Sequence, residues 1–122
     1  MSESIKHECG IALLRLLKPI DFYKKKYGSS LYGLNKMYLL MEKQHNRGQD
    51  GVGIANVKLD TEPGKRYISR KRSIAANPLQ DLFKQVNKRF VELEKSNPQK
   101  LGDCKWMKEN LPFTGELYLG CL

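Results

Sequence analysis

The chain has 122 residues, of which 40% are hydrophobic and 29% are charged, values that are ordinary for one small globular domain. It contains no apolar run near the ~20 residues that span a bilayer, and residues 1–8 lack the pattern of a secretory signal. The formal net charge is +9, but the basic residues are scattered and form no nucleic-acid motif. We therefore expect a cytoplasmic protein with a solvated basic face and neither a membrane nor a nucleic-acid partner.

The first half of the chain predicts one strand and one helix. Residues 1–8 are polar, and the apolar run from Cys9 to Leu17 predicts a buried strand. Residues 19–28 are charged and tyrosine-rich, and we expect a connector there. A helix capped by Ser29 or Ser30 should follow and end near residues 45–48. Its buried face is indicated by apolar residues at three- and four-residue steps: Leu31, Leu34, Met37, Tyr38 and Met41.

The second half predicts three strands and another helix. Residues 51–59 and 66–72 should be strands joined by a turn at 60–65, which contains Pro63 and Gly64. Pro78 suits the first turn of a helix. Residues 98–110 are ambiguous, with a short helix expected around Trp106, and 115–122 are strand-like up to the last residue. The helix from Pro78 should bury an apolar stripe: Leu79, Leu82, Phe83, Val86, Phe90 and Leu93. This order of elements predicts an α+β domain.

The three cysteines, Cys9, Cys104 and Cys121, lie far apart in the sequence. No Cys-x-x-Cys pair is present, so their spacing predicts neither a zinc site nor a disulfide framework. We therefore expect no metal and no cofactor in this chain. Only Cys9 has neighbours that suggest chemistry.

Two short motifs stand out when they are considered together. Cys9-Gly10-Ile11 opens the first predicted strand, and His45-Asn46-Arg47-Gly48-Gln49-Asp50-Gly51 follows the first predicted helix. The pair resembles the class II, or N-terminal-nucleophile, glutamine amidotransferases, and the Gln-Asp ending is most like their amidophosphoribosyltransferase branch. The resemblance is close over residues 7–60 and loose elsewhere.

The resemblance implies that Cys9 is the catalytic nucleophile and that L-glutamine is the substrate. In this family the mature chain begins at the cysteine, whose own α-amino group acts as the base. A thiol of pKa ~8.5 needs such an acceptor at neutral pH. We therefore expect residues 1–8 to be a leader that is removed. The thiolate would attack the glutamine amide, release ammonia and leave a thioester for water to hydrolyse.

The second motif implies further site residues. By resemblance, the turn containing Arg47 and Gly48 packs beside the nucleophile, and both residues are predicted to bind substrate. A purely structural role for Arg47 stays open, and His45 is expected to be a helix-end residue. Glycines in this turn would let the backbone approach closely.

The resemblance also implies that residues 9–122 are an incomplete amidotransferase domain. The fold should be part of a four-layer αββα arrangement with antiparallel sheets. Cys121 stands where the family has a histidine, and neither the carboxylate-binding arginine nor the phosphoribosyltransferase domain follows. We therefore expect little activity from this chain alone. Two alternatives stay open: a different class II branch, and a non-catalytic remnant that forms homo-oligomers or binds a partner through an open sheet edge, with the last strand unpaired.

Overall fold

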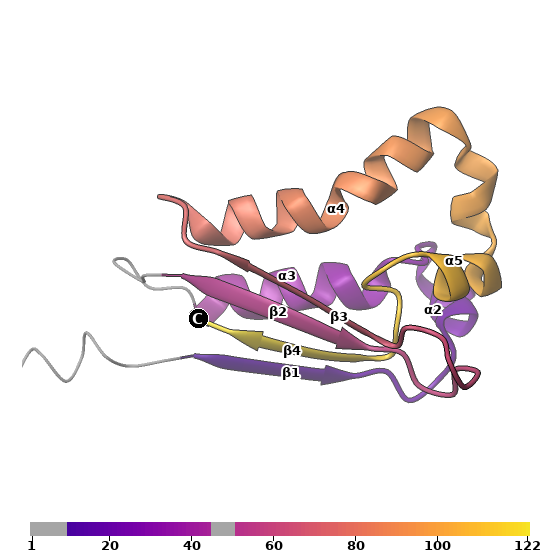
Figure 1. Cartoon of the computed structure of the whole chain (residues 1–122), viewed down its shortest axis with the longest axis horizontal. Coiled ribbons are helices and arrows are strands. Elements are labelled where there is room, and N and C mark those ends of the chain that lie inside the picture. Colours follow the sequence, from indigo (N-terminus) through magenta and orange to yellow (C-terminus); the bar gives the residue numbers. More distant parts are fainter. Residues whose placement is uncertain (1–9, 45–50) are drawn as a thin grey trace, which may run out of the picture.

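The computed structural model describes residues 10–44 and 51–122, which form a small α+β protein (Figure 1). A four-stranded antiparallel sheet and four α-helices make up this part of the chain. In chain order the elements are β1 (Ile11–Arg15), α2 (Ile20–Tyr27), α3 (Tyr32–Gln44), β2 (Val52–Val57), β3 (Ile68–Ser73), α4 (Pro78–Ser96), the 3-10 helix η1 (Pro98–Gly102), α5 (Cys104–Asn110) and β4 (Leu117–Cys121).

The last strand lies in the interior of the sheet. The strand order is β1-β4-β2-β3, and all neighbouring strands are antiparallel. Leu119 of β4 lies opposite Leu13 of β1 on one side and opposite Ala55 of β2 on the other. The expectation that residues 115–122 form an unpaired edge is therefore wrong, and in the described part of the chain the edges are β1 and β3.

Two long helices cover one face of this sheet. Helix α3 packs on β1 and β4, and α4 packs on β2 and β3. Helix-facing strand residues such as Ala12, Ile54 and Tyr118 join both helices in one apolar core. The predicted stripes are confirmed, because Met37, Met41, Leu79 and Leu82 are fully buried. Such burial is the main stabilising contribution to a domain of this size.

The opposite face of the sheet carries apolar side chains that no described element covers. The strand period of two places Ile11 and Leu13 of β1 beside Leu119 of β4 on this face. Their exposed fractions are 65%, 66% and 43%. This uncovered face, with helices only on the other side, makes the described part of the chain a two-layer structure (Figure 1).

Residues 19–28 form a helix rather than the expected connector. Helix α2 begins after Pro19 and ends at Gly28, whose φ of 81° is the left-handed conformation that favours glycine. Sequence patterning missed it because only Ile20 is buried. The helix is instead attached by aromatic stacking, with the rings of Tyr27 and Tyr32 4.4 Å apart.

The other predicted elements are found close to their expected positions. Strands β1 and β2 lie within their predicted segments, β3 extends one residue beyond the predicted 66–72, and helix α4 begins at Pro78 as expected. The ambiguous segment 98–110 contains η1 and α5. The predicted end of the first helix, at residues 45–48, lies outside the described residues. No helix in the described ranges is long and apolar enough to cross a membrane.

Candidate functional site

The predicted catalytic and substrate-binding residues lie outside the described part of the chain. This applies to Cys9, Arg47 and Gly48, to the leader 1–8 and to the remainder of the motif at 45–50. Their sequence neighbours are described, however: Gly10 follows Cys9, Gln44 precedes His45, and Gly51 follows Asp50.

These neighbours converge on one end of the sheet. The backbone of Gly10 exchanges two hydrogen bonds with Leu122, at 3.3 and 2.9 Å. A Cβ atom on Gly10 would lie only 2.8 Å from Oε1 of Gln44, at the end of α3. Gly51 leads into β2, where Gly53 pairs with Cys121 of β4. The residues that flank the two motifs, namely Gly10, Gln44 and Gly51, therefore lie together near the end of β4.

A cavity of about 520 Å³ opens on the uncovered face at this end of the sheet. Small residues form part of its lining, because Gly53 and Ala55 lie between the β4 and β3 side chains. Cys121 and Arg72 flank Gly53 on its two neighbouring strands. Cys121 is an exposed free thiol, and Arg70 and Arg72 are exposed on β3. The cavity can thus hold a ligand with an anionic group near the β3 arginines.

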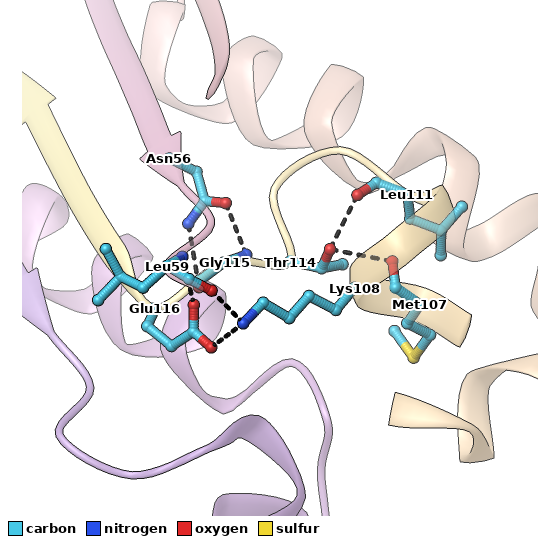
Figure 2. Close-up of polar contacts among 8 residues, drawn as sticks. All are labelled: Asn56, Leu59, Met107, Lys108, Leu111, Thr114, Gly115 and Glu116. Carbon is cyan, nitrogen blue, oxygen red and sulfur yellow. Dashed lines mark hydrogen bonds and ion pairs between the residues drawn. The ribbon is translucent and has the colours of Figure 1, made fainter. Parts of the chain in front are cut away.

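A buried side chain fixes the start of β4, at the far end of the strand (Figure 2). Asn56 of β2 is fully buried, and its Nδ2 donates to the carbonyl oxygens of Gly115 and Leu117, both at 3.1 Å. Its Oδ1 accepts a hydrogen bond from the Gly115 backbone N–H at 2.7 Å. These bonds satisfy every polar atom of the amide except one Oδ1 lone pair. Asn56 therefore sets the register with which β4 enters the sheet.

An ion pair holds the same turn from the other side (Figure 2). Lys108 of α5 donates to Oε2 of Glu116 at 2.6 Å and to the carbonyl oxygen of Leu59. Oε1 of Glu116 accepts from the backbone N–H of Leu59 at 2.9 Å. Thr114 adds hydroxyl contacts to the carbonyls of Met107 and Leu111. The entry to β4 is therefore rigidly tied to α5 and to the end of β2.

Sequence reasoning missed both Asn56 and Lys58 as buried polar residues. The alternation of Val52, Ile54 and Asn56 in β2 continues at Lys58, directly after the strand, and all four residues are buried. This period of two was the signal in the sequence that could have revealed their burial, because it assigns Asn56 and Lys58 to the side that faces the core. Burial lowers the pKa of Lys58, and the positive charges of Lys108 and Arg66 lower it further.

No cluster of metal-ligating side chains occurs among residues 10–44 and 51–122. Comparisons with protein families, with curated proteins and with solved structures gave no match to this chain.

Proposed function

We propose that this chain carries the glutaminase site of a class II glutamine amidotransferase, with Cys9 as the nucleophile. The thiolate attacks the side-chain amide carbon of L-glutamine, and the amide nitrogen leaves as ammonia after taking up a proton. Water then hydrolyses the thioester to glutamate and restores the thiol. The ammonia passes to a phosphoribosyl acceptor, which the Gln49-Asp50 pair favours over the acceptors of other branches.

The observation that carries the proposal is the convergence of Gly10, Gln44 and Gly51. A composite site needs its parts to lie within reach of one substrate, because catalysis depends on near-contact geometry. The two motifs are more than thirty residues apart in sequence. Their described neighbours nevertheless lie at the same end of the sheet, where Gly10 pairs with Leu122 and Gly53, two residues after Gly51, pairs with Cys121. This is the arrangement expected if both motifs contribute to one site.

The layer structure supports the finer fold proposal. A two-layer arrangement of one antiparallel sheet and two covering helices corresponds to half of a four-layer αββα fold. The uncovered face, with Ile11, Leu13 and Leu119, is the one on which a second sheet would pack. We propose that the complete domain has that architecture.

The proposed chemistry requires the removal of residues 1–8. An α-amino group of pKa ~8 is matched to accept a proton from the Cys9 thiol, but an amide nitrogen is not. Cleavage of the Glu8–Cys9 bond would free that amine. Arg47 and Gly48 would then shape the substrate site, with the guanidinium binding a carboxylate.

Two measurements test the proposal. Intact-mass analysis of the purified protein should show a chain that begins at Cys9. A chloroketone analogue of glutamine should then alkylate Cys9 selectively, L-glutamine should protect the thiol, and Arg47→Ala should slow the alkylation. Cys9→Ser should abolish it.

Cys104→Ser is the matched control, because Cys104 is described, lies at the start of α5 and is not assigned as the nucleophile. It should leave the alkylation of Cys9 unchanged. Equal alkylation of all three cysteines, without protection by glutamine, would contradict the proposal.

A non-catalytic remnant is the second candidate, and one observation favours it. Strand β1 is an edge of the sheet in the described part of the chain, and Ile11 and Leu13 on it are largely exposed. Such an edge can pair with a strand of another copy. Sedimentation velocity would then show a dimer that Ile11→Lys or Leu13→Lys disrupts. A different class II branch is the third candidate, and the acceptor domain decides it.

A further inference from the structure

A cavity of about 220 Å³ lies between the β2–β3 connection and helix α5. It lies at the opposite end of β2 from Gly51. Five basic side chains line it, against three acidic ones. The basic residues are Lys58, Lys65, Arg66, Lys105 and Lys108, and the acidic ones are Asp60, Glu62 and Glu109.

The buried member of this set is Lys58, with an exposed fraction of 8%. Among the residues that the structure describes, its ammonium group makes no hydrogen bond and no ion pair. The charges that act on it are the cations Lys108 and Arg66. A buried ammonium that faces other cations is costly, since burial removes water and the neighbours repel it. An anion in the cavity would remove this cost.

The acidic residues of the cavity do not supply that anion. Asp60, Glu62 and Glu109 are all exposed, where solvent weakens their interaction with a buried charge. The described ion pair of this region joins Lys108 to Glu116, so the ammonium group of Lys108 is already engaged as a donor. Lys58, Lys65, Arg66 and Lys105 are left as donors toward the cavity.

We propose that this cavity binds a phosphate-type oxyanion. The buried Lys58 would hold the anion from inside the cavity, and the exposed side chains of Arg66 and Lys105 would hold it from the rim. Lys58 supplies a buried point charge, while the guanidinium of Arg66 offers planar paired donors that match phosphate oxygens. One Arg66 donor, Nε, already contacts the carbonyl oxygen of Ile68 at 3.3 Å, which orients the group. The oxyanion is either free phosphate or the phosphate group of a small molecule.

The assignment to this cavity can be separated from its neighbour. Lys58 and Arg66 also line a second cavity of about 380 Å³, to which Lys71 contributes and Lys105 does not. Lys105 and Lys71 are both exposed, so either can be replaced with little effect on folding. The pair Lys105→Ala and Lys71→Ala therefore reports which of the two cavities the anion occupies.

Isothermal titration of the full chain with inorganic phosphate, and separately with phenyl phosphate, tests the proposal at low ionic strength. The wild type should bind at least one of the two. Tighter binding of phenyl phosphate would identify the phosphate of a larger ligand, and preference for inorganic phosphate would identify the free ion. Lys58→Met should weaken binding roughly tenfold or more, and Lys105→Ala about threefold. Lys71→Ala should leave it unchanged.

Three results would overturn the inference: no binding of either probe at millimolar concentration, equal binding by Lys58→Met, or a loss with Lys71→Ala that Lys105→Ala does not show. Circular dichroism of each variant verifies that it is folded. Because binding is measured directly, the outcome is independent of any glutaminase activity at Cys9.

Discussion

The side chain of Asn56 and the backbone of Gly115 exchange two hydrogen bonds across 59 positions of sequence, at 2.7 and 3.1 Å. The amide thereby acts as a substitute strand partner at the point where β4 enters the sheet. The pair lies in the interior, since Asn56 is fully buried. Its loss would leave backbone groups of Gly115 without partners.

Replacing Asn56 with leucine should therefore destabilise the protein strongly. The leucine side chain is similar in size but leaves the N–H and the carbonyl oxygen of Gly115 without the partners they have now, at about 1–3 kcal/mol for each group that water does not reach. We expect a loss of about 3 kcal/mol in the free energy of unfolding, measured by urea denaturation. Asn35→Ala, on the exposed side of α3, is the control and should change it by less than ~0.5 kcal/mol.

Gly115→Ala should be equally damaging for a different reason. A Cβ atom at this position would overlap the backbone carbonyl of Val57, which cannot move without distorting β2. We expect a loss of about 2–3 kcal/mol from this overpacking. Gly53→Ala is the matched control, because its Cβ would meet its nearest atom at an ordinary 3.5 Å. Equal urea midpoints for the two variants would contradict the described path of the chain at Gly115.

Lys58→Met should stabilise the protein, and the gain should depend on pH. Burial, with Lys108 and Arg66 nearby, lowers the pKa of Lys58 in the folded state below its ordinary value of 10.5. The unfolded chain then binds more protons at this site, so wild-type stability rises with pH up to that ordinary value. The advantage of the methionine variant should be largest at neutral pH and should shrink toward pH 10.5.

Thermal denaturation of both proteins between pH 7 and pH 10.5, in buffers free of phosphate and sulfate, measures this difference. A constant difference across the range would show that Lys58 titrates as it does in the unfolded chain.

The two described cysteines should differ in reactivity toward a soluble disulfide reagent. Cys121 is exposed on the uncovered face, whereas Cys104 is partly buried at the start of α5. Burial raises the pKa of the Cys104 thiol, which lowers its thiolate fraction at neutral pH. We expect Cys121 to react several-fold faster in the native protein, with the two rates converging in urea. Mass mapping after timed quenching assigns each rate to its cysteine.

Most of the fold was predictable because its helices and strands carry strong apolar periodicity. Leu79, Leu82 and Val86 define the buried stripe of α4, and Val52 and Ile54 define that of β2. Helix α2 was missed since aromatic stacking between Tyr27 and Tyr32, rather than an apolar stripe, attaches it. The position of β4 was also wrong, because strand order depends on long-range pairing that local patterns do not encode.

The candidate site was predictable in a narrower sense. The motifs at Cys9 and at residues 45–51 indicated chemistry in the sequence alone. That the residues next to these motifs lie close together near Leu122 follows from the order of the strands in the sheet, which the sequence patterns did not give. Sequence reasoning treated the basic residues as a solvated face, and it overlooked Lys58 because a lysine next to a turn is usually exposed. The alternation that continues from Val52 to Lys58 was the one local signal of its burial, and the cover comes from α5, which lies near the β2–β3 connection.

The central position of β4 has a consequence for synthesis on the ribosome. Strand β1 is made first, yet its partner in the sheet is translated about a hundred residues later. Until β4 has been translated, β1 can pack only against α3, whereas β2 and β3 can already form a hairpin. A nascent chain of this protein should therefore assemble its core late and in one step, with the slow kinetics of distant strand pairing.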